Sequence, residues 1–162
     1  LCARLGNGRT LIFRGTIAGM EKAVTTLAEL EAEAARFVGT LAPRPHATLV
    51  TLSGELGAGK TAFTKAAARA LCIPEMVTSP TFVLEKIYLL PEEQAFRRLI
   101  HIDAYRLEKG SELGPLGFNE LMHDTTNLIF LEWPERVKEA LPIPAAQISF
   151  IVHTDSRILS YG

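Results

Sequence analysis

A short run of glycines followed by a lysine and a threonine is the part of this sequence whose spacing carries the clearest chemistry. Gly54, Gly59, Lys60 and Thr61 fit the pattern G-x-x-x-x-G-K-[ST], in which a loop turns its backbone N–H groups toward a chain of phosphates. The lysine is expected to reach the β- and γ-phosphates of a nucleotide, and the threonine hydroxyl to ligate Mg²⁺. The residues of this loop predicted to bind the nucleotide are Gly54, Glu55, Leu56, Gly57, Ala58, Gly59, Lys60, Thr61 and Ala62.

The residues on either side of the loop fit the strand and the helix that it must join. An apolar, β-branched run at 49–52 precedes it, and an alanine-rich helical pattern follows it as far as Leu71. A helix that begins near Lys60 points its positive dipole end and its unpaired N–H groups at the phosphates. With glycine at about 7% of average usage, the four fixed positions would coincide by chance on the order of one per cent of the time or less. The sequence therefore predicts nucleotide binding, although it does not name the reaction.

Two apolar segments further along the chain end in a carboxylate. Asp103 follows the run at 98–102, and Glu132 follows the run at 128–131. Ligands of doubly wound sheets bind beyond the carboxyl ends of the strands. We therefore predict that Thr61, Asp103 and Glu132 hold Mg²⁺ or its water ligands, and that Glu132, with the longer side chain, also positions the attacking water. For either acid alone, a helix cap or a solvent-facing side chain fits the sequence about as well as a functional role. Two such acids together with a phosphate loop favour a nucleotide site.

Several other polar or aromatic residues carry less specific signals. Thr81 is a candidate switch residue that would contact Mg²⁺ and the γ-phosphate, and Ser79 is the alternative. The competing interpretation is that these hydroxyl residues only shape the turn around Pro80. Arg106 is a candidate cation beside the γ-phosphate. The sequence fits an ion pair between Arg106 and a neighbouring acid equally well. Trp133 is expected either to cover the nucleotide or to pack in the core. His101 alternates with apolar neighbours, which favours a structural role.

The order of the predicted elements indicates an α/β fold, a P-loop NTPase-type three-layer sandwich with a mostly parallel central sheet and antiparallel hairpin strands. A capping box at Thr26 and Glu29 predicts a helix that continues at helical spacing to Leu41. The other predicted elements are a strand at 23–25, an extended stretch at 82–90 that forms a hairpin with a strand at 98–103, short helices around Glu112 and Asn119, a strand at 128–132, a helix at 134–141, and a hairpin of 147–153 with 157–161.

Composition narrows the class of protein further. The 162 residues carry a formal net charge of −1, whereas a dedicated nucleic-acid surface usually shows a strong basic excess, so no DNA partner is predicted. Cys2 and Cys72 lack the spacing of metal ligands, and so few cysteines fit a reducing cytosol. No apolar run approaches the roughly 20 residues that would span a bilayer. We therefore expect a cytoplasmic protein without a membrane partner.

Four blocks of this sequence together resemble the bacterial TsaE family, also called YjeE, the small ATPase of tRNA threonylcarbamoyladenosine (t6A) synthesis. They are SGELGAGKTAF at 53–63, TSPTFVL at 78–84, HIDAYRL at 101–107 and LIFLEWPERV at 128–137. The phosphate loop is shared by many families, but S-P-T, D-x-Y-R and L-E-W-P in this order are specific. The resemblance covers residues 23–161 and implies a single P-loop ATPase domain at 20–162, with residues 1–19 as an N-terminal extension.

The resemblance also implies a mechanism and partners. Such proteins bind ATP or ADP with Mg²⁺, hydrolyse ATP slowly alone, and associate with TsaB and TsaD, which install threonylcarbamoyl on adenosine 37 of tRNAs. The chain is then expected to meet tRNA only indirectly, through that complex. The residues that match the family motifs are Lys60 and Thr61 as phosphate and metal contacts, Asp103 as the metal-side acid, Glu132 as the catalytic acid, Trp133 as an active-site aromatic and Thr81 as the switch threonine. Lys60 and Thr81 are thus predicted to act with Glu132 in catalysis.

One position departs from the family pattern. The family usually has a second hydroxyl residue after the threonine of the loop, and this chain has Ala62 there. The missing hydroxyl removes a hydrogen bond to the α-phosphate, and such a bond typically contributes about 0.5 to 1.5 kcal/mol to binding. Weaker ATP binding is therefore expected.

Two other functions stay open on the sequence alone. A small-molecule or nucleotide kinase would need an acceptor site and an arginine-rich lid, for which the stretch from Arg97 to Arg106 is the only candidate. A nucleotide-sensing interaction module would bind ATP and barely hydrolyse it. A GTPase is disfavoured because the guanine-reading pattern N-K-x-D is absent from the sequence.

Overall fold

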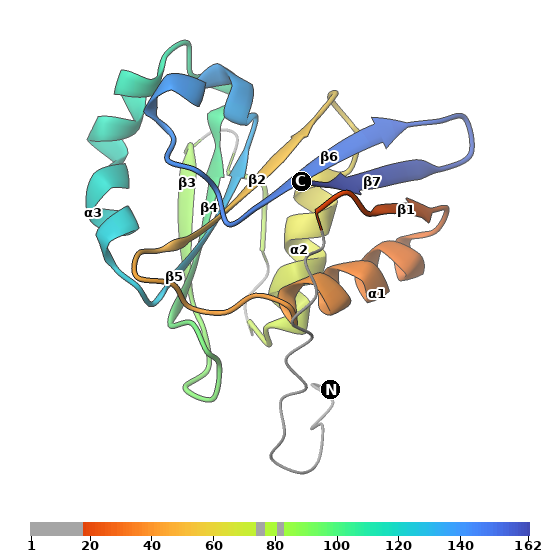
Figure 1. The fold of residues 1–162 in the computed structure, drawn as a ribbon, viewed down its shortest axis with the longest axis horizontal. Helices are drawn as coiled ribbons and strands as arrows, with labels where there is room; N and C mark the ends of the chain where they lie inside the picture. The colour runs from red at the N-terminus through yellow and green to blue at the C-terminus, as the bar shows by residue number, and fades with distance from the viewer. Residues whose placement is uncertain (1–17, 74–76, 81–82) are drawn as a thin grey trace.

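A seven-stranded sheet runs through the computed structural model, which describes residues 18–73, 77–80 and 83–162 (Figure 1). The strands lie in the order β1-β7-β6-β2-β5-β4-β3. Neighbours among β6, β2, β5 and β4 run parallel, whereas β3 pairs antiparallel with β4, β7 with β6, and β1 with β7. The predicted α/β fold, with a mostly parallel centre and antiparallel hairpin strands, is confirmed, and the hairpins lie at 85–103 and 146–161.

The elements follow one another in the order that the sequence patterns indicate. Those described are β1 (Glu21–Val24), α1 (Leu27–Val38), β2 (Thr48–Gly54), α2 (Lys60–Ala70), β3 (Glu85–Leu89), β4 (Arg98–Asp103), the 3-10 turns η1 (Ala104–Arg106) and η2 (Gly110–Leu116), α3 (Phe118–His123), β5 (Asn127–Glu132), the 3-10 turns η3 (Pro134–Arg136) and η4 (Lys138–Ala140), β6 (Ala146–Val152) and β7 (Arg157–Tyr161). The helix predicted at 134–141 is wrong. Two separate 3-10 turns form there, because Val137, whose side chain is fully buried, has a φ of −134° and breaks the helical path.

The start of α1 forms as its sequence predicts. The Thr26 hydroxyl accepts the N–H of Glu29 at 3.1 Å, and the Glu29 carboxylate accepts the N–H of Thr26 at 3.3 Å. These two bonds satisfy N–H groups that have no partner within the helix. The buried face of α1 is shorter than the sequence spacing predicts. Leu27 at its start is 61% exposed, and the helix ends at Val38 before it reaches Leu41.

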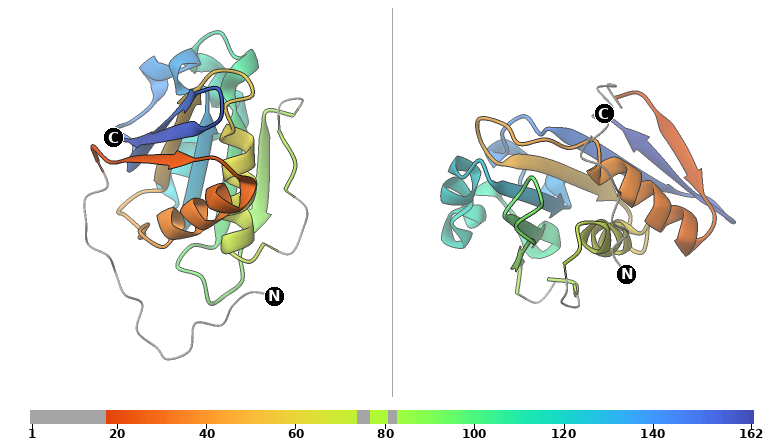
Figure 2. Two further views of the ribbon diagram at one scale, coloured as in Figure 1. Left: turned by 90° about the vertical axis from the view of Figure 1, so that its right-hand side faces the viewer. Right: turned by 90° about the horizontal axis from the view of Figure 1, so that it is seen from below.

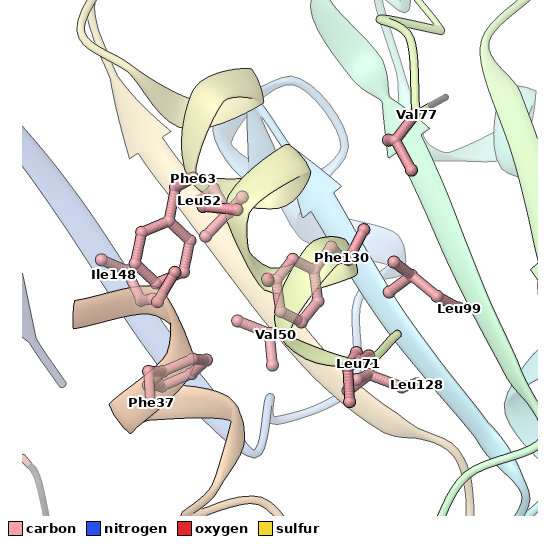
Figure 3. Packing of buried hydrophobic residues seen from close by; sticks show 14 of the residues in the cluster. Phe37, Val50, Leu52, Phe63, Leu71, Val77, Leu99, Leu128, Phe130 and Ile148 are labelled. Carbon is pink, nitrogen blue, oxygen red and sulfur yellow. The ribbon is translucent and has the colours of Figure 1, made fainter. Parts of the chain in front are cut away.

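Helices cover both faces of the sheet. In Figure 2, α1 and α2 lie together on one face, and they contribute to a core with β2 and β5. Figure 3 shows this core, in which Phe37 of α1, Phe63 of α2 and Phe130 of β5 belong to one cluster with apolar side chains of β2. The rings of Phe37 and Phe63 have centroids 5.7 Å apart. A second cluster on the opposite face joins η2, α3 and η3–η4 to Ile100, Ile102, Ile129 and Leu131. The strand ends are therefore held from both sides.

Some expectations fall on residues that the structure does not describe. Residues 1–17, which form most of the predicted extension, and Thr81, the predicted switch residue, lie outside the described ranges. Within those ranges, none of the helices is both long and apolar enough to cross a membrane.

A buried polar contact fastens the last strand to α1. Glu33 is 4% exposed, and it accepts hydrogen bonds from the Tyr161 hydroxyl at 2.5 Å and from Nε of Arg36 at 2.9 Å. Burial raises the pKa of the Glu33 carboxyl, but the bonds from Arg36 and Tyr161 outweigh it, so the pKa lies below its ordinary value. Burial also raises the pKa of the Tyr161 hydroxyl, and the bond to Glu33 adds to that shift.

We expect Tyr161→Phe to lower the free energy of unfolding at pH 7 by about 1.5 to 3 kcal/mol, because it removes a hydrogen bond to a buried carboxylate. The pKa of Glu33 is lower in the folded state, so its ionisation stabilises the fold above the ordinary value of 4.5 and this stabilisation is lost as the pH falls through the folded pKa. The difference between the two proteins should therefore shrink in acid. Urea unfolding at several pH values measures it. Tyr88→Phe is the control, because the Tyr88 hydroxyl contacts the backbone of Thr78, at 3.4 to 3.5 Å. Equal stability of wild type and Tyr161→Phe at pH 7 would contradict the expectation.

Candidate functional site

The glycine-rich loop lies between the end of β2 and the start of α2. Gly54, Gly57 and Gly59 have φ angles of +140°, +78° and +112°. A Cβ at Gly54 would lie 2.6 Å from the carbonyl oxygen of Phe150, so the loop cannot pass β6 with a larger residue there. A Cβ at Gly57 would meet nothing within 4 Å, so this part of the loop borders open space. The glycines therefore fit the predicted role, in which backbone and not side chains faces a ligand.

The loop leads directly into the amino end of α2. The first helical bond in this turn runs from the N–H of Phe63 to the carbonyl of Gly59 at 2.8 Å. The N–H groups of the residues before Phe63 have no partner within the helix, and the helix dipole places partial positive charge there. A phosphate group fits this end of α2 because it accepts such bonds and carries the opposite charge.

Lys60 lies inside the loop and is only 4% exposed. Its ammonium donates to the carbonyl oxygens of Gly54 at 2.6 Å and Glu55 at 2.9 Å, and it lies 3.8 Å from the centroid of the Trp133 ring. Burial lowers the pKa of this ammonium, and the nearby carboxylates of Glu132, Glu135 and Asp103 act in the opposite direction. The loop thus holds a cation at its centre, where a phosphate chain would be bound.

The sheet register places the two predicted acids side by side. Asp103 at the end of β4 is the direct partner of Glu132 at the end of β5, and Leu52 of β2 is the partner of Glu132 on the other side. Parallel strands end at the same edge of the sheet, so both carboxylates reach the edge from which the loop emerges. Glu132 is 2% exposed, and both of its oxygens accept from the hydroxyl of Thr61, at 2.9 and 3.0 Å.

Asp103 caps a turn, as one of the predicted alternatives has it, and it also lies at the hollow. Its carboxylate accepts the N–H of Tyr105 at 3.0 Å and so caps η1, and the residue also lines the same hollow as Lys60 and Glu132. Among the described residues, no three His, Cys, Asp or Glu side chains converge on a metal position. Magnesium needs only one or two carboxylates when phosphates and waters complete its coordination, and Thr61 with Asp103 and Glu132 fits that donor set.

Trp133 has a backbone conformation that is rare for a bulky side chain, with a φ of +60°. It follows Glu132 directly, and its ring packs against that of Tyr105 with centroids 5.0 Å apart. The ring is half-buried, contacts the second core cluster and lines the hollow over Lys60. Core packing therefore holds in part, and the predicted contact of the ring with the nucleotide stays a prediction.

These residues border a hollow of about 350 Å³, which falls in the size range of ligand sites. The residues that line it are Leu56, Gly57, Ala58, Gly59, Lys60, Thr61, Ala62, Asp103, Tyr105, Glu132 and Trp133. A second hollow of about 270 Å³ shares Gly57, Ala58, Gly59 and Ala62 with it and extends to Val24, Thr25, Thr26, Leu30 and Arg157. A larger one, of about 420 Å³, lies near Thr48 at the amino end of β2, but no acid, His or Cys lines it.

The structure does not bring every predicted residue to the site. Arg106 is exposed at the end of η1 and does not line the hollow, and Ser79 is exposed and does not line it either. Their predicted contacts stay predictions. Sequence reasoning missed Tyr105, which lines the hollow beside Trp133, and His101, whose Nε2 lies 2.7 Å from Oε1 of Glu132. The missing signal is the pairing of β4 with β5, which the local pattern does not specify.

Comparison with known proteins connects this site to a family. The sequence profile described as "Threonylcarbamoyl adenosine biosynthesis protein TsaE" matches residues 21–159. The TsaE protein of Bacillus subtilis is 42% identical over 103 residues, which span 62% of this chain and 59% of the relative. That of Rickettsia typhi is 35% identical over 114 residues, which span 69% of this chain and 75% of the relative.

A solved structure supports the same relationship. The crystal structure of Bacillus subtilis YdiB superposes with a TM-score of 0.69 and 29% sequence identity, over 88% of this chain and 83% of that one. The matched residues contain the glycine-rich loop, both acids and Trp133, so the similarity includes the whole candidate site. The chain belongs to the TsaE family of threonylcarbamoyl adenosine biosynthesis proteins.

Proposed function

We propose that this chain is a P-loop ATPase that binds ATP with Mg²⁺ and acts on the TsaB/TsaD complex in the synthesis of t6A at position 37 of tRNA. The single observation that carries the proposal is the convergence of Lys60, Thr61, Asp103 and Glu132 on one hollow at the end of the parallel strands. Family membership supplies the biological process. In this proposal the protein is cytoplasmic, ADP is its product, and it meets tRNA only through the complex.

Each residue of the site would have a distinct task. The loop amides and the amino end of α2 would bind the phosphates, and Lys60 would exchange a carbonyl partner in its own loop for a phosphate oxygen. Bound Mg²⁺ would neutralise charge on the phosphates. The Thr61 hydroxyl donates its hydrogen bond to Glu132, so its oxygen keeps lone pairs for that ion. Asp103 lies one strand away and would hold the ion or its water ligands.

Glu132 is the residue proposed to act on water. Its longer side chain reaches the hollow from the end of β5, where it accepts hydrogen bonds and lies between the strands that carry the loop and Asp103. A carboxylate in this place can orient a water molecule toward the γ-phosphate. In the described structure the same carboxylate also binds Thr61, so it is close to both the metal side and the phosphate side of the site.

The second hollow is the space proposed for the nucleoside part of ATP. It continues from the loop glycines and Ala62 toward Thr25, Thr26 and Arg157, whereas the acids lie on the other side of the loop. We propose that the phosphates occupy the first hollow and that the ribose and base extend into the second. Ala62 lies where the two meet, which is where a hydroxyl would reach the α-phosphate.

The kinase alternative loses one of its candidate lid arginines. Arg98 opens β4 and forms an ion pair with Asp124, and its register partner is Asn127 at the start of β5. The strand runs from there to Asp103, so Arg98 lies at the edge of the sheet opposite the loop. The alternative of an interaction module that barely hydrolyses ATP differs from our proposal only in turnover.

We expect Lys60→Ala to weaken ATP binding by about 1.5 to 3 kcal/mol, roughly 10- to 150-fold, because it removes a charge-assisted contact to phosphate. Calorimetric titration measures the affinity. Lys65→Ala is the matched control, since Lys65 lies on the same helix and does not line the hollow. Equal affinity of wild type and Lys60→Ala would reject the placement of the triphosphate.

We expect Glu132→Gln to abolish most ATP hydrolysis stimulated by TsaB and TsaD while ATP still binds, because the amide is a poor base and carries no charge. Rates of phosphate release with and without the partners measure this, and the expected loss is on the order of 10² to 10⁴. Glu120→Gln, an exposed change on α3, is the control. Unchanged turnover in Glu132→Gln would favour the interaction module and remove the catalytic role of this acid.

We expect Ala62→Ser to tighten ATP binding by about 0.5 to 1.5 kcal/mol, because its hydroxyl can bond the α-phosphate. The control is Ala70→Ser, at the far end of α2, which should leave the affinity for ATP unaltered. Titration of the two variants beside wild type tests the expectation, and a weaker complex with Ala62→Ser would show that no phosphate lies within its reach.

A further inference from the structure

A histidine lies beneath the proposed catalytic acid, outside the residues that line the hollow. His101 is in the middle of β4, and none of its side chain is exposed. Its Nε2 lies 2.7 Å from Oε1 of Glu132. Neither the glycine-rich loop nor a substrate contact explains this residue, because it does not line the hollow.

The sheet geometry brings the two side chains together. His101 and Asp103 are two residues apart on β4 and so project from the same face, whereas Ile100 and Ile102 project into the cluster on the other face. Asp103 is the register partner of Glu132, and His101 is the register partner of Phe130. His101 is therefore the diagonal neighbour of Glu132. Residues at this diagonal are within reach of long side chains.

The ring forms one polar contact and no other within the described residues. Its Nδ1 is buried and has no hydrogen-bond partner there. A proton on Nε2 lets the ring donate to the carboxylate, and we assign this tautomer from the contact. An imidazole placed only to fill the core would be a costly choice beside Leu99 and Phe130, because its buried polar atoms need partners that an apolar side chain does not.

The contact leaves the two oxygens of Glu132 unequal. Oε1 accepts from His101 and from the hydroxyl of Thr61, and Oε2 accepts only from Thr61 among the bonds described. The ring therefore anchors one oxygen and fixes the plane of the carboxylate. Oε2 has fewer described partners, and it is the oxygen that would accept from a metal-bound water or from the attacking water.

We infer that His101 is a positioning residue, which donates a hydrogen bond through Nε2 to hold the Glu132 carboxylate in the orientation that Mg²⁺-nucleotide binding and hydrolysis require. The inference rests on the proposed function, since it assigns His101 a role in that same site. It differs from a packing role in one respect. A packing residue supports the fold, whereas a positioning residue acts through Glu132 alone.

The test is the gain in ADP affinity that Mg²⁺ produces, measured by calorimetry in Mg²⁺ and in EDTA. Outer residues that orient a metal ligand typically cost 10- to 100-fold when they are removed, so we expect His101→Leu to reduce the Mg²⁺-dependent gain by about 10-fold or more. The affinity in EDTA should stay within about twofold of wild type, because the phosphate loop is untouched. Glutamine carries its amide nitrogen about as far from the backbone as Nε2, so His101→Gln should retain most of the gain.

Two controls separate orientation from packing. Leu99→Ala removes an equally buried side chain from the same face of β4, and it should lower thermal stability without changing the Mg²⁺-dependent gain. In a Glu132→Gln background, His101→Leu should have little further effect, because the group that it positions is already altered. If His101→Leu does not fold, His101→Asn replaces it, since the shorter amide cannot reach Oε1.

The outcomes are distinct. The inference is overturned if the variant lacking the donor keeps the wild-type gain, if it loses affinity equally in EDTA, or if its effect persists in full in the Glu132→Gln background. A wild-type chain that binds no ADP under either condition would instead overturn the proposed function, and the inference with it. Rates of phosphate release with the partners, lowered in His101→Leu and rescued in His101→Gln, give an independent reading of the same effect.

Discussion

The hydrogen bond from Thr61 to Glu132 joins the start of α2 to the end of β5, and the chemistry of the site depends on it. One partner belongs to the glycine-rich loop that would bind phosphate, and the other to the acids that would serve Mg²⁺ and water. The two residues are 71 positions apart in sequence. They meet because β2 and β5 are parallel neighbours, with Leu52 opposite Glu132. A shift of this register by one residue would turn Glu132 to the other face of the sheet and separate the two halves of the site.

Such a site needs rigid support, because it buries several charges. Lys60, Asp103 and Glu132 are each less than 5% exposed. A buried charge is costly unless hydrogen bonds or opposite charges compensate it. The structure supplies these bonds from fixed groups: loop carbonyls for Lys60, a backbone N–H for Asp103, and the Thr61 hydroxyl with the His101 ring for Glu132. The apolar clusters on the two faces of the sheet hold these groups in place. Packing around the site is therefore part of its chemistry.

The sequence predicts the local parts of this arrangement well. The glycine-rich loop, the capping box at Thr26 and the acids at the ends of two strands each depend on neighbouring residues, and each forms as expected. Contacts that depend on pairing between distant segments were not predictable in this way. The sequence pattern favours a structural role for His101, because its alternation shows which face it occupies but not that Glu132 lies diagonally opposite. The contact of Glu33 with Tyr161 likewise depends on where β7 lies relative to α1.

Trp133 shows how the backbone decides the position of a side chain in this site. Its N–H donates to the carbonyl of Leu52 at 3.1 Å, which extends the contact between β5 and β2 one residue beyond Glu132. The chain then leaves the sheet toward Pro134, and a φ of +60° makes this turn at Trp133 itself. Conformations of this kind cost on the order of 1 to 3 kcal/mol in non-glycine residues and persist where the surroundings impose them. Here the strand contact and the packing against Tyr105 impose it, and the ring is held over the Lys60 ammonium. The strain therefore lies at the position that sets one wall of the hollow, where a glycine would relieve it and remove the wall.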